Sequence, residues 1–314
     1  MNKAEKKETA PAVQEGAIAM INVNAAVPAE MNLSADYDTQ QSKEELGLKD
    51  FSMPYVKIAQ PLSPAVDSGH DAYIPGLKIG DLYNSVTEEI WPTAPERPES
   101  ERVNILVVPS FVRPTYVEWK PRGAGGGFVM DHGLGEGTRL MAEIVREKRF
   151  DQTTGHPLLA NGNELMETTY WFATVVDQER SQQVIFAFSS TGLSKTSKPW
   201  AMLCNNLTGP NQEKVHRAYG VYTFTPRRTT NDKGWWIYLK PSPYCVEDKP
   251  INTFMLRNGV DTYNKAIEFA DQVSHLLDEG AEIIPQAQDD YDTAPITNME
   301  APTEEAMNAD QGNY

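Results

Sequence analysis

The chain has 314 residues, of which 40% are hydrophobic, and its formal net charge is -16. Two cysteines, Cys204 and Cys245, are too few for a disulfide framework and indicate a reducing compartment. The sequence has no apolar run near the roughly 20 residues of a membrane-spanning helix. Its N-terminus also lacks the apolar core of a secretory signal. We therefore expect a soluble intracellular protein.

The charge is unevenly distributed along the chain. Residues 1–100 contain 8 Lys or Arg and 16 Asp or Glu, residues 101–250 contain 18 and 15, and residues 251–314 contain 2 and 13. The total charge alone argues against a nucleic-acid partner, but it conceals a slightly basic middle between two acidic ends. The distribution therefore keeps nucleic acid among the partners to consider.

Composition divides the chain into three parts. Residues 1–48 are rich in Ala, Glu, Gln, Asn and Thr, which predicts a disordered arm, and residues 281–314 form an acidic tail that we also expect to be disordered. Residues 49–280 then make the folded core. Its first elements are a short strand at Met53–Ala59, where apolar and polar residues alternate, and a second short strand pair within Tyr73–Tyr83.

Strand patterns dominate the middle of the chain. The expected strands are Val103–Val108, Phe111–Trp119, Tyr170–Val176 and Val184–Phe188, followed by a hairpin of Tyr219–Phe224 and Trp235–Leu239. We expect the loop of this hairpin to run from Pro226 to Gly234, and Gly123–Gly127 to be a flexible loop tip. The pattern of Leu140–Val145 fits either a strand or a short helix.

Two helices are expected after the first strands. Residues 197–207 form a short helix whose first turn accepts Pro199, because proline's missing N–H has no partner there. Asp261–Leu277 has apolar residues at helical spacing and is followed by Gly280, which ends the helix. A short helix before a last hairpin predicts a mainly β fold with an oligonucleotide-binding (OB) type of small barrel, in which a helix lies between the third and fourth strands. A β-sandwich is the alternative.

Basic and aromatic residues are interleaved throughout the middle segment. Single-stranded nucleic acid requires this mixture, because cations neutralise phosphates and flat rings stack on bases. The predicted binding residues are Trp119, Lys120, Arg122, Arg146, Lys148, Arg149, Lys195, Lys198, Trp200, Arg227, Arg228, Lys233 and Trp235. The competing interpretation is that the rings are core residues and the charges a solvated rim. In particular, one of the adjacent residues Trp235 and Trp236 must face the core of a strand that is buried on one side.

The sequence offers little support for an enzyme or a metal site. The five histidines and two cysteines have no CxxC or HxxxH spacing, and the glycine loop at residues 123–127 lacks the Gly-Lys-Ser/Thr ending of a P-loop. Asp131, His132 and Glu136 lie beside two glycines, which we interpret as a turn. We therefore expect no catalytic residues, no metal and no cofactor.

Three segments of the chain resemble single-stranded DNA-binding proteins of tailed bacteriophages. They are MPYVKIAQ at residues 53–60, GLKIGD at residues 76–81, and residues 190–200, where STGL is followed by KPW. The resemblance covers roughly residues 50–280 and the tail. It implies an OB-like core that binds single-stranded DNA without sequence preference, and an acidic C-terminal tail that contacts replication or recombination proteins in the cytoplasm of the host cell.

The leading hypothesis is therefore a phage protein that coats single-stranded DNA during replication or recombination. The alternative is a virion-associated or other protein-interaction protein in which the same aromatics form the core. A DNA-processing enzyme is the third hypothesis. For the tail, the hypotheses are a solubilising end, a polyanion that competes with DNA for the basic groove, and a partner-binding motif.

Overall fold

The computed structural model describes residues 53–176, 181–231, 234–278 and 283. The predicted arm at residues 1–48 and, except for Ile283, the predicted tail at residues 281–314 lie outside the described residues. The same holds for residues 177–180, which connect the strands predicted at Tyr170–Val176 and Val184–Phe188, and for Gly280. What is described is mainly β, as the sequence predicts. None of its helices is long and apolar enough to span a membrane.

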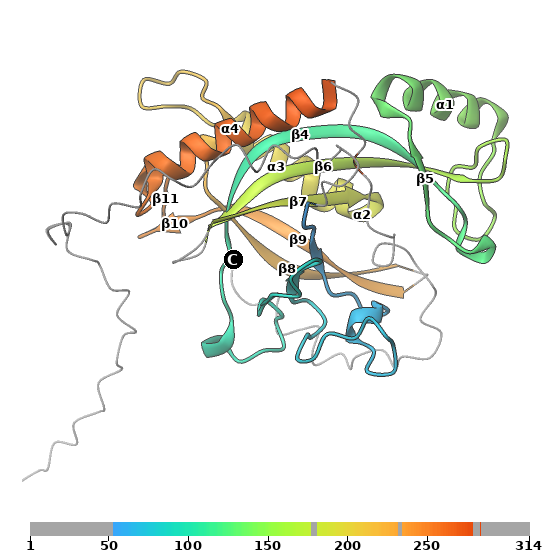
Figure 1. Cartoon of the computed structure of the whole chain (residues 1–314), viewed down its shortest axis with the longest axis horizontal. Helices are drawn as coiled ribbons and strands as arrows, with labels where there is room; N and C mark the ends of the chain where they lie inside the picture. Colours follow the sequence, from blue (N-terminus) through green and yellow to red (C-terminus); the bar gives the residue numbers. More distant parts are fainter. Residues whose placement is uncertain (1–52, 177–180, 232–233, 279–282, 284–314) are drawn as a thin grey trace, which may run out of the picture. The chain divides into compact units, whose positions relative to one another are not determined.

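The main sheet is antiparallel, and five of its strands lie in the order β7-β6-β4-β8-β9, with β5 pairing to β4 (Figure 1). The strands are β4 (Leu106–Trp119), β5 (Phe128–Asp131), β6 (Glu164–Val176), β7 (Ser181–Ser189), β8 (Tyr222–Asn231) and β9 (Gly234–Pro243). β6 pairs along the whole length of β4, whereas β8 pairs with β4 only at Val107 and Tyr222. β8 and β9 therefore form a two-stranded ribbon that joins the sheet at one point.

Strand β4 is longer than the sequence predicts. Two strands were expected, Val103–Val108 and Phe111–Trp119, but the chain continues as one strand with a register shift against β6 between Pro109 and Phe111. Proline has no N–H to give to the ladder, and a bulge is one of the places where a sheet tolerates it. The separation into two strands was therefore wrong, although strand character is confirmed for Phe111–Trp119 and for the second half of Val103–Val108.

The N-terminal part forms a small sheet of its own, with β1 (Val56–Ile58), β2 (Leu82–Asn84) and β3 (Ile90–Trp91) in that order. β1 confirms the strand predicted at Met53–Ala59. The strand pair predicted within Tyr73–Tyr83 was wrong in its first half, because turns run from there to β2, with Gly76 and Gly80 at positive φ. Only glycine adopts that backbone conformation without strain.

The remaining elements include four helices and a small hairpin. The helices are α1 (Gly133–Glu147), α2 (Ser190–Gly192), α3 (Lys198–Asn205) and α4 (Gly259–Asp278), a π-helical turn (Leu193–Ser197) links α2 to α3, and β10 (Cys245–Val246) pairs with β11 (Lys249–Pro250). α3 and α4 confirm the two predicted helices. Short 3-10 turns occur at Pro64–Val66, Glu99–Glu101, Arg122–Ala124, Arg217–Tyr219 and Thr253–Met255.

Helix α1 resolves the ambiguous segment at Leu140–Val145 and corrects the turn predicted around Gly133 and Glu136, which are its first residues. α1 packs on β4 through Gly137, where an added Cβ would lie 2.2 Å from the Cβ of Tyr116. A glycine is therefore needed here for close approach of helix and strand. Local helix periodicity was hidden because three of the first five residues of α1 are glycines.

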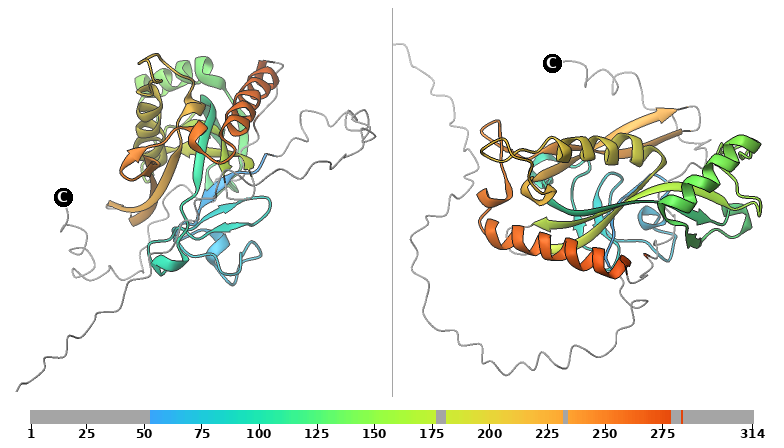
Figure 2. Two further views of the ribbon diagram at one scale, coloured as in Figure 1. Left: turned by 90° about the vertical axis from the view of Figure 1, so that its left-hand side faces the viewer. Right: turned by 90° about the horizontal axis from the view of Figure 1, so that it is seen from above.

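The largest core cluster lies between the sheet, the ribbon and α3. Trp171 of β6 stacks on Trp200 of α3 at a centroid distance of 4.1 Å, and both side chains are fully buried. Phe186 of β7 and Phe224 of β8 complete this cluster, with Phe224 set edge-on to Trp200 at 4.8 Å. Helix α4 packs on the opposite face of the sheet, against β4 and β6, where Phe269 contacts Phe172 (Figures 1 and 2).

The described strands do not close into a barrel, so the predicted OB barrel is not confirmed. Side chains occupy the edge of β9 instead. Gln60 donates to the Ile237 carbonyl at 2.7 Å and accepts from the Ile237 N–H at 2.9 Å, and the Thr196 hydroxyl accepts from the Leu239 N–H at 3.2 Å. On the other side, Tyr55 makes a parallel bridge with Ile185 of β7. The segment from Tyr55 to Gln60 thus contacts both outer strands of the sheet.

Candidate nucleic-acid interface

The β8–β9 ribbon has two faces of different chemistry. The strands pair Arg227 with Tyr238 and Thr229 with Trp236. Side chains alternate between the faces of a strand, so Trp236, Tyr238 and Lys240 share one face with their partners on β8. We call this set the aromatic face: Thr225, Arg227, Thr229, Trp236, Tyr238 and Lys240. Its two rings are partly exposed and its two cations are exposed.

The opposite face of the ribbon packs inward. Phe224, Ile237 and Leu239 are buried in the main core, and Trp235 packs against that core while remaining partly exposed. The Arg228 guanidinium lies 4.2 Å from the centroid of the Trp235 ring, within the range of a cation–π contact. Both residues were predicted to bind nucleic acid, and the structure brings them together on this inward face.

The turn that follows β7 contributes a cation to the aromatic face. The Lys195 ammonium lies 5.4 Å from the centroid of the Tyr238 ring. Thr191 of α2, which precedes the π-helical turn that contains Lys195, lines a crevice of about 20 Å³ together with Trp236 and Tyr238. Lys198, at the start of α3, is exposed. The predicted residues Lys195 and Arg227 are thus both on the aromatic face. Arg227 and Arg228 lie in β8, so the prediction that they belong to the hairpin loop was wrong. Lys233 lies outside the described residues.

Two predicted stacking residues are core residues instead. Trp119 is 5% exposed at the end of β4 and packs edge-on against Phe128. Trp200 is fully buried against Trp171. A base cannot stack on a ring that other side chains already cover, so we assign both tryptophans to the scaffold.

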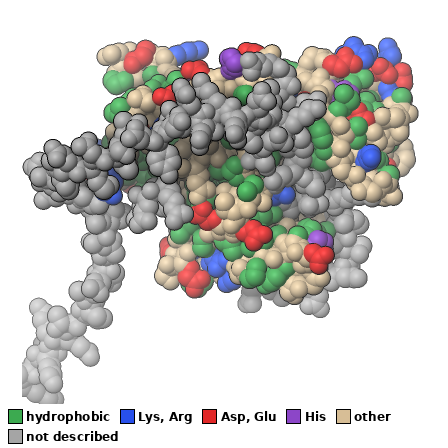
Figure 3. All heavy atoms as spheres, viewed as in Figure 1, with side chains coloured by type: hydrophobic (Ala, Val, Ile, Leu, Met, Phe, Trp, Pro, Cys, Tyr) green, Lys and Arg blue, Asp and Glu red, His purple; other side chains and the backbone are tan. Residues whose placement is uncertain are grey.

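The other predicted cations lie at or near the β5 end of β4 and on α1. Lys120 is exposed after β4, the backbone of Arg122 lies in a 3-10 turn, and Lys148 ends α1 with a φ of 55°. Arg146 pairs with Glu147 at 3.3 Å, and Arg149 pairs with Glu143 at 2.7 Å. On the face drawn in Figure 3, the described Lys and Arg side chains are likewise mixed with Asp and Glu. Together with the ribbon, these cations therefore do not form a basic surface that is free of acidic side chains.

Sequence reasoning missed Trp236, Tyr238 and Lys240. The signal was present in the sequence. Ile237 and Leu239 are the apolar residues of this strand, and Trp235 lies an even number of positions from both, so the three side chains share one face. Alternation therefore places Trp235 inward and Trp236 outward, beside Tyr238. The sequence prediction named Trp235 of this pair and left out Trp236, the member on the aromatic face.

A buried polar cluster anchors the end of β4 near α1. One oxygen of the Glu118 carboxylate accepts from Asn161 and Asn163 at 2.9 and 2.6 Å, and the other lies 2.7 Å from His132 Nε2. Burial raises the pKa of Glu118, but these hydrogen bonds outweigh it and hold the pKa below its usual value. The cluster thus ties β4 to the residue before α1 and to the segment that leads into β6.

The described residues contain no group of three His, Cys, Asp or Glu side chains that could hold a metal ion. Cys204 of α3 is buried, and burial raises the pKa of its thiol to about 11. At neutral pH this thiol is protonated and therefore a weak nucleophile. Cys245 is exposed on β10.

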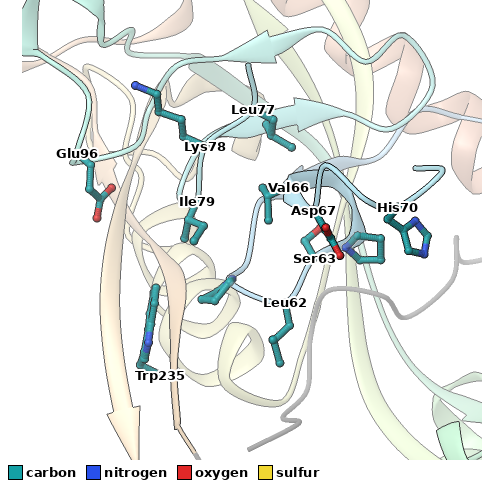
Figure 4. A pocket seen from close by; sticks show the side chains of 12 residues that line it. Leu62, Ser63, Val66, Asp67, His70, Leu77, Lys78, Ile79, Glu96 and Trp235 are labelled. Atoms are coloured by element: carbon teal, nitrogen blue, oxygen red, sulfur yellow. The ribbon is translucent and has the colours of Figure 1, made fainter. Parts of the chain in front are cut away.

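An open pocket of about 660 Å³ lies beside Trp235, between the ribbon and the N-terminal part of the chain (Figure 4). Figure 4 shows Trp235 on one side of the opening and Leu62 and Val66 on the other. Ile79, Leu77 and two prolines add further apolar surface, whereas Ser63, Asp67, His70, Lys78 and Glu96 contribute polar groups. We refer to it as the Trp235 pocket.

Comparison with known proteins places the chain among bacteriophage proteins. Residues 22–275 match the family model of the Pam3 phage gp34-like protein, and because this match spans most of the chain, the protein belongs to that family. No curated protein and no solved structure gives a significant match. The phage origin implied by the three resembling segments is confirmed, and single-stranded DNA binding stays a prediction.

Proposed function

We propose that the protein binds single-stranded DNA without sequence preference, and that the aromatic face of the β8–β9 ribbon is the binding surface. The observation that carries the proposal is the placement of Trp236 and Tyr238 on one face, two residues apart, with Arg227, Lys240 and Lys195 around them. Two residues along a strand span roughly 7 Å. Rings at this spacing offer separate platforms for bases, and the cations lie where they can neutralise phosphates.

The topology supports this assignment. Counted along the chain without β5, the main strands are β4, β6, β7, β8 and β9, and α3 lies between the third and the fourth, as in an OB fold. In space they lie in the order third, second, first, fourth, fifth. This is the order of an OB barrel opened between its third and fifth strands. OB folds bind oligonucleotides partly through the loop that joins strands four and five, and here that loop is the end of the ribbon.

Helix α4 explains why the ribbon would carry the binding. The face of strands two and three is the other common OB binding surface. Here Phe269 and Val273 of α4 cover that face by packing on Tyr170, Phe172 and Ile185. DNA would therefore be directed to the ribbon.

The first test is a fluorescence anisotropy titration with a labelled poly-dT oligomer. The wild-type protein should bind, with log K falling as log salt rises by about 0.7 per phosphate neutralised. Trp236→Ala should weaken binding about 5- to 150-fold, since stacking is worth roughly 1–3 kcal/mol per base. Phe254→Ala is the matched control, because Phe254 is an exposed ring, 45% accessible, that lies outside the ribbon. Absence of salt-dependent binding, or equal loss in both variants, would contradict the proposal.

The acidic tail extends the same proposal. Residues 286–314 contain seven Asp or Glu and no Lys or Arg, so a tail tethered to a basic surface would compete with DNA for it. Deleting residues 286–314 should tighten poly-dT binding at low salt. Unchanged affinity would leave the tail as a contact site for replication or recombination proteins in the host cytoplasm, which is the other role we propose for it.

A further inference from the structure

We propose that the Trp235 pocket binds a nucleobase. This inference rests on the proposed function, because it would extend the DNA path from the aromatic face to the opposite side of the ribbon. Trp235 and Trp236 are adjacent in β9 and point to opposite faces. A single strand of DNA that stacks one base on Trp236 could therefore pass around the hairpin end of the ribbon and place another base against Trp235.

The shape and lining of the pocket suit a flat, mostly apolar ring. Its volume of about 660 Å³ lies within the range of small-molecule sites, which are usually walled by apolar and aromatic groups with a few polar ones. The Trp235 indole forms one wall, and Leu62 and Ile79 contribute aliphatic surface (Figure 4). The Arg228 guanidinium covers a ring face of Trp235 but does not line the pocket, so a different part of the indole is open to a ligand.

An unpaired hydroxyl provides a second, independent observation. Ser63 lines the pocket, its side chain is almost fully buried, with 2% of the residue exposed, and its hydroxyl has no hydrogen-bond partner within the described part of the chain. A buried polar group without a partner is destabilising, because it has lost its hydrogen bonds to water. Nucleobases carry hydrogen-bond donors and acceptors on their edges, so a bound base would supply the missing partner.

Charged groups at the rim fit the rest of a nucleotide. Lys78 is exposed at the pocket, and Arg228 lies against the Trp235 ring, so a phosphate attached to the base would have cations within reach. The Asp67 carboxylate accepts the Gly69 N–H through one oxygen, which leaves its other oxygen able to accept from an amino group of a base.

The test measures Trp235 directly. The six indole N–H signals of ¹⁵N-labelled protein would be followed by NMR during titration with dTMP, with dGMP and with poly-dT, and Trp235→Phe would identify the signal of Trp235. Deoxyribose 5-phosphate serves as the probe without a base. Leu62→Glu should weaken nucleotide binding at least tenfold, because it brings a carboxylate to the opening. Leu62 is 49% exposed, so this change should leave folding intact. Val86→Glu is the matched control, since Val86 is 52% exposed and does not line the pocket.

Two results would support the inference and two would overturn it. A shift of the Trp235 signal by mononucleotides, lost in Leu62→Glu, shows a pocket open to separate nucleotides. A shift by poly-dT alone, lost in the same variant, shows that the base comes from the strand. No shift with any base-containing probe overturns the inference, as does equal binding of deoxyribose 5-phosphate. The Trp236→Ala anisotropy result remains separate, so failure of the pocket and failure of the ribbon are distinguishable.

Discussion

The β8–β9 ribbon and helix α1 both concentrate basic residues, but they hold them against different partners. Arg146 of α1 and Arg149, two residues after the helix ends, pair with glutamates of α1. Arg228 of the ribbon and Lys195 of the adjoining π-helical turn lie over aromatic rings of β9, and none of the described residues of β8 or β9 is Asp or Glu. A cation already paired with a carboxylate gains little from a phosphate, whereas one beside a ring can contact phosphate while the ring stacks on a base. Basic residues alone therefore do not mark the site.

The largest expected effect is a loss of stability caused by a change in α1. Gly137→Ala would place a Cβ 2.2 Å from the Tyr116 Cβ and force α1 away from β4, which should lower the free energy of unfolding by about 3 kcal/mol. Chemical denaturation measures this change. Gly135→Ala is the control, because its Cβ would meet nothing within 4 Å. If the folded Gly137→Ala protein also lost poly-dT affinity, α1 and the ribbon would be coupled and the comparison would fail.

The next effect concerns the edge of the ribbon. Gln60→Ala removes both hydrogen bonds to Ile237 and leaves a buried N–H and a buried carbonyl without partners, which should cost about 2 kcal/mol of stability. Poly-dT affinity should fall as well, because β9 would lose the contact that fixes its edge. Gln182→Ala is a suitable control, since Gln182 bonds Asn84 and Glu89 away from the ribbon. Unchanged affinity in Gln60→Ala would show that the ribbon keeps its shape without this contact.

The charges of the aromatic face should set the salt dependence. Replacing Arg227 and Lys240 together by Gln removes two proposed phosphate contacts, so the slope of log K against log salt should become shallower by about 1.4. Both residues are exposed, so stability should change little. Anisotropy titrations at four or more salt concentrations give the slope. An unchanged slope would remove these two cations from the binding surface.

Much of the fold could be predicted from the sequence where local patterns are strong. The apolar run in β7 and the helical spacing in α4 identified both elements. The helix α1 could not be identified in the same way, because its fit to β4 depends on Gly137 and on a tertiary contact with Tyr116 that local propensity does not encode. The continuous β4 was missed for a similar reason, since its prolines argue against a strand unless the bulge is known.

The chemistry of the candidate site was predicted from the sequence, but only some of its residues were. Cations interleaved with rings pointed to the region that contains the ribbon, yet Trp200 had the same local signature and is core. Its burial depends on Trp171, which lies 29 positions earlier in the sequence and meets it only through the fold. Within the ribbon, the alternation of Ile237 and Leu239 could have identified Trp236 as the outward ring. The Trp235 pocket depends on residues from distant segments, which no sequence pattern connects.

The smallest expected effect tests the comparison most directly. The double variant Arg146→Gln and Lys148→Asn removes two predicted cations from the end of α1, and asparagine tolerates the positive φ of residue 148. Because Arg146 is paired with Glu147, poly-dT affinity should change less than twofold and the salt slope should stay constant. The single variant Lys240→Gln, on the ribbon, should shift the slope by about 0.7 in the same assay. A comparable change of the salt slope in the α1 variant would mean that the DNA also contacts this end of the sheet. In an OB-like topology, α1 belongs to the connection between the first two strands, which is itself a binding loop in that fold. The ribbon and α1 would then be two parts of one surface, and paired cations would have to be counted as contacts.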